Sequence, residues 1–410
     1  MPDAERKRYR LACLVTHPIQ YQAPLFRRIA ADPEIAFKAF FATDFSARDY
    51  VDPEFGQSIA WDVPLLDGYE SEVLPRLPGS GYPGDTYFDA WRPFSTGLRS
   101  RLRAGGFDAL WVHGYARAPH VWAMMAARMA GAKVLLRDET SDAGRPRAGA
   151  RQVVKRLLFR GIDPLVDAYL TIGTANEEHL ERLGVDRRKF FRMGYAVDNL
   201  WFRARMDEAA ATRESLRAEL DVAPGRPIAL YAAKLIDRKA PLDLVEAFAR
   251  AVDGAADGAG PALLMAGDGD LRPAVEARIA ALGVGERIRL LGFQSQRRLA
   301  ALYDLCDVFA LPSERETWGL VVNEVMNAGR AVVASDRVGA ARDLVRHGVT
   351  GYVHPHGDVE ALAARLRDCF ADPARLAEMG RAGRAVIEAW DFEADVAGLK
   401  AALAAVVKPR

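Results

Sequence analysis

Two glutamates, Glu316 and Glu324, are the residues whose type and spacing most strongly indicate chemistry. They lie in the segment PSERETWGLVVNEVMNAG, residues 312–329, on either side of Trp318 and Gly319. A helix is predicted to begin between them, and the free N–H groups and partial positive charge of a helix start suit a diphosphate. A carboxylate accepts two hydroxyl hydrogen bonds at once. The pattern therefore predicts a diphosphate at the helix start, with one carboxylate on a ribose and the other on a sugar.

The same two glutamates could instead have only structural roles. Glu316 would then be an ordinary acid at a helix start, and Glu324 a solvated surface residue. The neighbours of Glu324 argue against solvation, because apolar residues surround it in the sequence and indicate a buried face. These neighbours are Val321, Val322, Val325 and Met326.

Lys234 and Lys239 form a second candidate group, directly after the apolar segment IALYAA. Lysines at the carboxyl end of a strand could neutralise the charge that develops on a departing nucleoside diphosphate. Such a site would need no metal ion. Lysines near a strand end are also often simply solvated, so this interpretation depends on the glutamates.

Two other pairs have spacings seen in metal sites. Asp268 and Asp270 form an Asp-x-Asp pair, but they follow the apolar segment LLMAG, where turn and helix-cap roles are expected. His354 and His356 lack an evident third ligand. We therefore predict no metal site and no cofactor.

The elements that position these residues alternate between short apolar strands and helices. In the N-terminal half, strands are predicted at 11–15, 35–42, 108–113, 132–137 and 168–173. In the C-terminal half they are predicted at 227–235, 261–267, 287–293, 307–312 and 331–335. Residues 43–95 have little periodicity and many aromatic residues, and they are interpreted as a long insertion. This alternation predicts an α/β fold with two doubly wound, Rossmann-like domains that face each other across a cleft.

We place the domain boundaries at 1–195 for an acceptor-side domain and 196–385 for a nucleotide-sugar-binding domain. Residues 386–410 are expected to form a helix that packs back on the N-terminal domain. Two domains also agree with a length of 410 residues, more than one core usually organises.

Composition excludes several classes of protein. Half of the residues are hydrophobic and the net charge is +1, so disorder and nucleic-acid binding are not expected. The three cysteines have no paired spacing for zinc or redox chemistry. The N-terminus has only a short apolar run, too short for a signal peptide, so we expect a cytoplasmic protein.

The C-terminal half resembles the retaining glycosyltransferases of family 4, which have the GT-B architecture. Four successive motifs carry the resemblance over roughly residues 228–385: AAKLIDRKAPLDLVEAF, LLMAGDGDLR, the run from LLGFQSQRRL through the two glutamates, and HGVTGYV. The resemblance implies a nucleoside-diphosphate sugar, with a UDP-sugar favoured, as the donor. It also implies that Glu316 contacts the transferred sugar, that Glu324 contacts the ribose, and that Lys234 and Lys239 hold the diphosphate. The donor-binding residues implied are Gly292, Phe293, Gln294, Thr317, Trp318, Gly319, Leu320 and Glu324.

The chain departs from the family pattern in places. Ala233 and Lys234 stand where Gly-Arg is usual, which keeps the charge but loses the bidentate guanidinium. Ala240 replaces a common glycine. The glycine-rich loop expected after the first strand is replaced by THPIQY, residues 16–21.

The N-terminal half resembles the family less specifically. His113, in WVHG, falls where the family places a histidine, so it is a candidate for contacting the donor sugar or the acceptor, although core hydrogen bonding is as plausible for a histidine at a strand end. His17 and Gln20 in THPIQY are candidates for acceptor binding. Arg137 and Glu139, in LLRDETS, are expected to face the cleft.

The stretch RPRAGARQVVKRLLFR, residues 145–160, carries six cationic residues and no acid, with apolar residues interleaved. Two interpretations stay open. One is a helix that lies on a membrane surface, which would make the protein peripheral at the inner face of the membrane. The other is an ordinary helix with a core face and a basic outer face.

The function predicted is transfer of a hexose-type sugar to a sugar or lipid-linked acceptor, in polysaccharide or glycolipid synthesis. One alternative is a sugar-nucleotide 2-epimerase on the same architecture, which would form an isomer with no acceptor present. Another is a protein that binds sugar nucleotides without catalysis. The sequence names neither the sugar, the acceptor, the linkage nor the oligomeric state.

Overall fold

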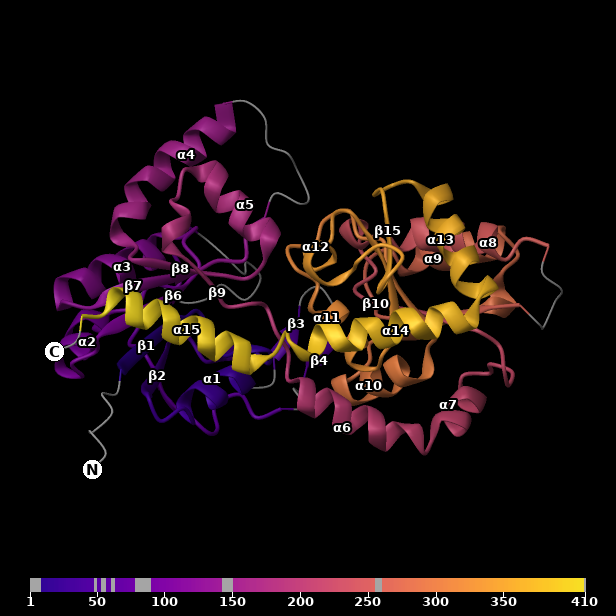
Figure 1. Cartoon of the computed structure of the whole chain (residues 1–410), viewed down its shortest axis with the longest axis horizontal. Coiled ribbons are helices and arrows are strands. Elements are labelled where there is room, and N and C mark those ends of the chain that lie inside the picture. The colour runs from indigo at the N-terminus through magenta and orange to yellow at the C-terminus, as the bar shows by residue number, and fades with distance from the viewer. Residues whose placement is uncertain are drawn as a thin grey trace.

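The computed structural model describes residues 9–47, 50–52, 57–59, 63–77, 90–141, 150–254 and 260–408. The chain forms two halves that lie side by side, each built on one parallel sheet (Figure 1). This arrangement confirms the predicted pair of Rossmann-like domains.

The N-terminal sheet has seven strands in the order β5-β2-β1-β6-β7-β8-β9, and all neighbouring strands are parallel. The strands are β1 (Tyr9–Val15), β2 (Ile35–Phe41), β5 (Glu70–Val73), β6 (Ala109–His113), β7 (Lys133–Arg137), β8 (Ala168–Thr171) and β9 (Phe190–Arg192). The associated helices are α1 (Gln22–Ala30), α2 (Leu98–Ala104), α3 (Ala118–Ala130), α4 (Ala150–Ile162) and α5 (Thr174–Leu183).

Alternate residues of β1 point to opposite faces of this sheet, so each face has its own core. Leu11 and Cys13 pack with residues of α1, whereas Ala12 and Leu14 pack with residues of α2, α3 and α5. Helices therefore cover both faces, which explains why its central strands consist mainly of apolar residues.

The C-terminal sheet has six parallel strands in the order β12-β11-β10-β13-β14-β15. They are β10 (Ile228–Ala232), β11 (Ala262–Ala266), β12 (Ile288–Gly292), β13 (Val308–Leu311), β14 (Ala331–Ser335) and β15 (Gly351–His354). The helices of this half are α6 (Asn199–Ala210), α7 (Arg213–Glu219), α8 (Pro241–Ala251), α9 (Arg272–Ala281), α10 (Gln296–Leu305), α11 (Leu320–Asn327), α12 (Ala341–Leu344), α13 (Val359–Ala371) and α14 (Pro373–Glu388).

All ten predicted strands are present, but three further strands join the sheets. β9 and β15 are edge strands of only three and four residues, too short to show a period in the sequence. β5 comes from the predicted insertion and pairs with β2, and its residues are exposed or half-buried, so no apolar run marked it. The same insertion holds a small antiparallel pair, β3 (Tyr50–Asp52) and β4 (Gln57–Ile59). Its aromatic residues Trp61, Tyr82, Tyr87 and Phe88 lie outside the described residues.

The last helix, α15 (Phe392–Val406), returns to the N-terminal half, while α14 lies on the C-terminal half (Figure 1). Its residues Val396, Leu399 and Leu403 join the core around β1. Lys400 of α15 also pairs with Glu34 at 2.6 Å. The C-terminal segment therefore ties the two halves together.

Gly398 allows this helix to approach the N-terminal sheet. A Cβ at this position would collide with the carbonyl oxygen of Arg192 at the end of β9. We expect Gly398→Ala to lower the free energy of unfolding by about 1–3 kcal/mol, because α15 must shift away from the sheet. Urea unfolding followed by circular dichroism measures this change.

The matched control is Gly161→Ala in α4, where the added Cβ meets open space. This control should leave stability equal or slightly higher. Equal stability for the two alanine variants would contradict the close contact between α15 and β9.

Candidate functional site

A cleft of about 490 Å³ lies between the two halves, and both of them line it. This volume is in the range of sites that bind small molecules or cofactors. The N-terminal half contributes Gln20, Tyr21, Glu139 and Tyr195. The C-terminal half contributes Lys234, Arg238, Lys239, Phe293, Gln294, Glu316, Thr317, Trp318, Gly319 and Leu320, among others.

Three cationic side chains line the C-terminal wall directly after β10. Lys234, Arg238 and Lys239 lie there, and Arg238 was not predicted. The loop is held in place from both sides, since Leu235 donates its N–H to the carbonyl of Asp268 at 2.9 Å, and the carbonyl of Arg238 accepts the N–H of Glu314 at 2.9 Å. A cluster of fixed cations in a partly buried cleft favours an anionic ligand.

Glu316 lines the same wall and forms an ion pair with Lys239. Its backbone is fixed at both ends, because its N–H donates to Arg337 at 3.1 Å and its carbonyl accepts from Gly339 at 3.1 Å. Both side chains of the pair are largely buried, with 13–14% exposed. The Glu316 carboxylate is therefore held near the N-terminus of α11, beside the positive charge of Lys239.

α11 begins between the two glutamates, as predicted, and Gly319 caps it with the positive φ of 94° that favours glycine. A Cβ at this position would lie 3.1 Å from Cγ of Glu316. The glycine thus lets the chain turn into the helix without displacing the acid. The first N–H groups of α11 begin at Leu320, which also lines the cleft.

Glu324, one turn into α11, is buried with 3% exposed, so the solvated interpretation is wrong. It does not line the cleft itself but lies behind Tyr21 and beside Tyr303, whose hydroxyl donates to its Oε2 at 2.7 Å. Burial raises the pKa of Glu324 to about 7, against the opposing effect of hydrogen bonds from Tyr303 and Tyr21. Tyr21, which belongs to the N-terminal half and lines the cleft, therefore links Glu324 to the opposite wall.

Glu139 is the acid of the N-terminal wall. Nε2 of His113 lies 3.0 Å from its Oε1, and the amide of Gln22 contacts the same imidazole at 3.3 Å. Burial acts to raise the pKa of Glu139, but the hydrogen bond and charge of His113 and a hydrogen bond from Tyr195 outweigh it, so this pKa is lowered. His113 does not line the cleft and contacts it through Glu139.

Of the other residues predicted for the N-terminal half, one lines the cleft and two do not. Gln20 lines the cleft. His17 does not, because its ring packs on Phe45 with 4.6 Å between centroids, and burial lowers its pKa to about 4. The expectation that Arg137 faces the cleft was wrong. Its guanidinium is 2% exposed, donates to the carbonyl of Gly194 at 2.9 Å and lies against the Trp111 ring.

Of the three consecutive residues 292–294, which the resemblance implies bind the donor, two line the cleft. Phe293 and Gln294 line the cleft, and Phe293 is 36% exposed. Gly292 ends β12, where its carbonyl accepts the N–H of Gly267 at 2.8 Å, and it does not reach the cleft lining. Trp318 lines the cleft, but its side chain is 2% exposed and stacks on Trp390.

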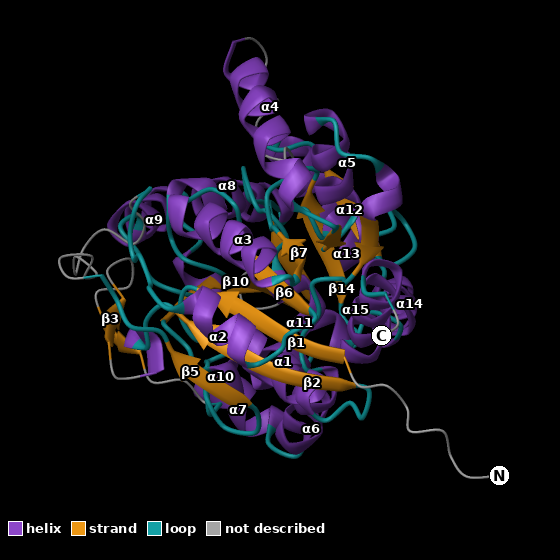
Figure 2. Ribbon diagram, turned by 90° about the vertical axis from the view of Figure 1, so that its left-hand side faces the viewer, coloured by secondary structure: helices purple, strands orange, loops and turns teal. Residues whose placement is uncertain are grey.

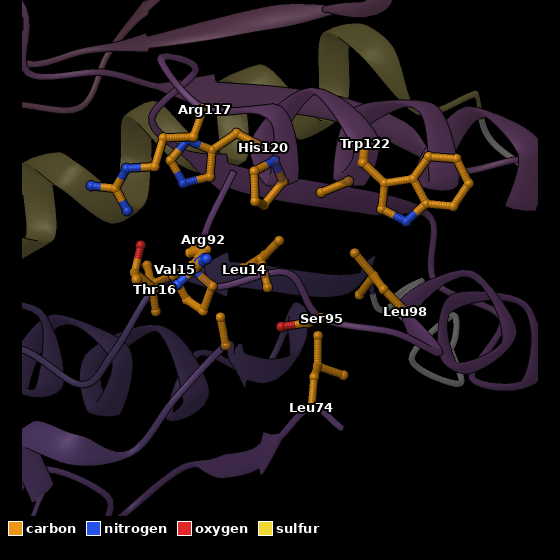
Figure 3. Close-up of a pocket in the computed structure, with 14 residues that line it drawn as sticks. Leu14, Val15, Thr16, Leu74, Arg92, Ser95, Leu98, Arg117, His120 and Trp122 are labelled. Atoms are coloured by element: carbon orange, nitrogen blue, oxygen red, sulfur yellow. The ribbon is translucent and has the colours of Figure 1, made fainter. Parts of the chain in front are cut away.

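A second cavity lies within the N-terminal half, above the end of β1 (Figure 3). Its volume is about 30 Å³, and aliphatic residues such as Leu14 and Leu98 line it together with His120 and Trp122. Burial lowers the pKa of His120 to about 3, so the imidazole is neutral. This space is too small for a sugar ring, whereas the interdomain cleft is not.

In the part of the chain that the structure describes, no three histidine, cysteine or acidic side chains are grouped so that they could hold a metal ion. Asp268 accepts the N–H of Gly269 at 2.8 Å and pairs with Arg272 at 3.1 Å, which is the turn role expected for it. His354 contacts the carbonyl of Pro355 at 2.9 Å and is buried.

Comparison with known proteins agrees with this geometry. Residues 212–386 match the family described as Glycosyl transferases group 1. The chain is 32% identical to the D-inositol 3-phosphate glycosyltransferase of Nocardia farcinica over 253 residues, which is 60% of this chain and 53% of that protein. It is 32% identical to the alpha-D-kanosaminyltransferase of Streptomyces kanamyceticus over 190 residues, 46% of this chain and 48% of that protein. The chain thus spans about half of the length of these relatives.

Solved structures extend the likeness of fold to nearly the whole chain. HepE of Anabaena, solved in complex with UDP and glucose, superposes with a TM-score of 0.69 at 17% identity, over 97% of this chain and all of that one. The likeness supports the predicted GT-B architecture for both halves, including the less specific N-terminal one.

Titration of Glu324 should be visible in the stability of the protein. The folded pKa of about 7 lies above the usual 4.5, so the folded protein retains a proton that the unfolded chain releases. This contribution to stability is full below about pH 4.5 and is lost as the pH rises to about 7, with a ceiling of about 3 kcal/mol.

We therefore expect Glu324→Gln to flatten the fall of stability between about pH 4.5 and 7, measured by urea unfolding at several pH values. Asp395, whose pKa burial also raises to about 7, is present in both proteins and cancels in the comparison. Identical pH profiles would show that Glu324 is ionised at neutral pH in the folded state.

Proposed function

We propose that this chain, whose residues 212–386 match the group 1 glycosyl transferases, transfers a hexose-type sugar from a nucleoside-diphosphate sugar to an acceptor hydroxyl, with retention at the transferred carbon. The proposal rests on the residues that form the C-terminal wall of the cleft. Lys234, Arg238 and Lys239 lie there together with Glu316 and the start of α11.

The donor diphosphate would lie against the three cations and the N-terminal N–H groups of α11. Two sources of positive charge then converge on the group that leaves, and both are fixed before the reaction begins. Arg238 adds a guanidinium near the position where the family usually has one, which compensates for Lys234. Electrostatic stabilisation of the departing diphosphate would supply most of the rate.

Glu316 would bind the hydroxyls of the transferred sugar. The ion pair with Lys239 holds the carboxylate in place and joins the sugar subsite to the diphosphate subsite. Glu324 would bind the ribose once Tyr21 moves aside, since that tyrosine lies between Glu324 and the cleft. Phe293 and Gln294 would then lie beside the base.

The acceptor would approach from the N-terminal wall. Glu139, which contacts His113, and Gln20 line this wall and would hydrogen-bond an acceptor hydroxyl as it attacks the anomeric carbon. In this scheme the carbon–phosphate oxygen bond breaks on the same face on which the new bond forms, and the hydroxyl proton passes to the departing phosphate. The acceptor would be a sugar or a lipid-linked acceptor, in polysaccharide or glycolipid synthesis.

Loss of either member of the central ion pair should stop transfer. We expect Glu316→Gln and Lys239→Met each to lower the release of nucleoside diphosphate by roughly a hundredfold or more, with folding intact. The assay supplies UDP-, GDP- and ADP-sugars in turn, UDP-sugars first, because the Anabaena neighbour was solved with UDP and glucose.

Glu314→Gln is the matched control, because Glu314 lies two residues before Glu316 and does not line the cleft. It should keep normal turnover. Normal turnover in either ion-pair variant would refute the proposal. Formation of an isomeric nucleotide sugar without acceptor would instead favour the epimerase, and binding without any release of nucleoside diphosphate would favour a non-catalytic protein.

Transfer by this cation cluster should not require a divalent ion. We expect activity to persist in an excess of EDTA, because Lys234, Arg238 and Lys239 provide the charge that Mg²⁺ provides in other enzymes. A loss of activity that added Mg²⁺ restores would contradict this and would point again to Asp268 and Asp270.

A further inference from the structure

We infer that α4 is a membrane-docking helix whose partner is an anionic lipid surface. This goes beyond the proposed transfer reaction and does not depend on it. The helix projects from the body of the molecule (Figure 2). Within the described part of the chain, no helix is both long enough and apolar enough to cross a bilayer, so any contact of α4 with lipid is a surface contact.

The outward face of α4 is aliphatic. Val153, Val154, Leu157 and Leu158 are 55–67% exposed, and their spacing of one, four and five residues places them on one side of a helix. Among the large apolar side chains in the described ranges, six are more than half exposed, and these are four of them. Such a concentration marks an interaction surface, whereas isolated exposed apolar residues need no explanation.

The opposite side of α4 is already used for packing. Phe159 is 1% exposed and meets the ring of Tyr115 edge-on at 4.9 Å between centroids. Nζ of Lys155 contacts Nε2 of His179 at 2.9 Å. The core face of this helix is therefore occupied by Phe159 and Lys155, and the four aliphatic residues are not part of it. The interpretation of α4 as an ordinary helix with a core face and a basic outer face is wrong for these residues.

The positive charge of α4 indicates which kind of partner its aliphatic face would meet. Arg156 and Arg160 are exposed on the same helix, and residues 150–162 contain four cations and no acid. A second copy of the chain would bring two such helices together and would be opposed by like charges. An anionic lipid surface satisfies both features, because arginines bind the headgroups while the aliphatic side chains enter the acyl boundary.

The test is sedimentation of the full-length protein with vesicles. Vesicles of phosphatidylcholine with about one third phosphatidylglycerol should bind the protein, and pure phosphatidylcholine vesicles should bind it much less. Binding should weaken when salt is raised from about 0.1 M to about 1 M. We expect Leu157→Gln with Leu158→Gln, and separately Arg156→Glu with Arg160→Glu, to reduce binding at least about tenfold.

Each variant has a matched control elsewhere on the surface. Leu200→Gln removes an aliphatic residue that is 78% exposed on α6, and Arg103→Glu with Arg381→Glu reverses two exposed charges outside α4. Both controls should bind vesicles like the unchanged protein, and circular dichroism confirms that all variants are folded.

Two results would overturn the inference. One is unchanged vesicle binding by the α4 variants, or equal loss in their controls. The other is a dimer, seen by sedimentation velocity, that Leu157→Gln with Leu158→Gln converts to a monomer, which would make α4 a contact between copies. Vesicle binding needs no donor sugar, so its failure and a failure of the proposed transfer are separate results.

Discussion

The position of Trp318 between the two halves determines the shape of the cleft. Its indole stacks on Trp390 at 5.3 Å between centroids and donates to Asn323 at 2.8 Å. Gly173 of the N-terminal half lies so close to this ring that any side chain there would collide with it. Asn323 in turn donates to the carbonyl of Tyr195 at 2.9 Å. The loop that carries Glu316 is therefore fixed by the same contacts that join the two halves.

This arrangement couples ligand binding to the relation between the domains. Tyr21, which comes from the other half, lines the cleft and hydrogen-bonds Glu324, which does not line it. Further ties lie beyond the cleft, where Asp343 accepts hydrogen bonds from the N–H and hydroxyl of Thr174 at 2.9 and 2.6 Å. Under the proposed function, a donor that binds both carboxylates would shift Tyr21, so the hydrogen bonds between the halves would set part of the free energy of donor binding.

The cleft holds acids and cations together, with Lys234, Arg238 and Lys239 on the C-terminal wall, so its electrostatics do not follow from the net charge of +1 for the whole chain. Lys239 and Glu316 pair on one wall, and His113 and Glu139 pair on the other. α4 shows the opposite arrangement, with cations and no acids beside exposed aliphatic side chains. The cleft thus combines acids with cations, whereas α4 carries unbalanced positive charge that would suit a broad anionic surface.

The sequence by itself determined the two parallel sheets and the C-terminal wall of the cleft. Apolar strands end where Lys234 and Glu316 begin, and residues after neighbouring parallel strands share one edge of a sheet, so local order was sufficient. Tertiary structure alone decided the rest. Tyr21 and Tyr195 reach the cleft, and Arg137 does not, because these placements depend on how one domain meets the other. The outward face of α4 was likewise undetermined, since an apolar periodicity marks a face but only packing shows whether another element covers it.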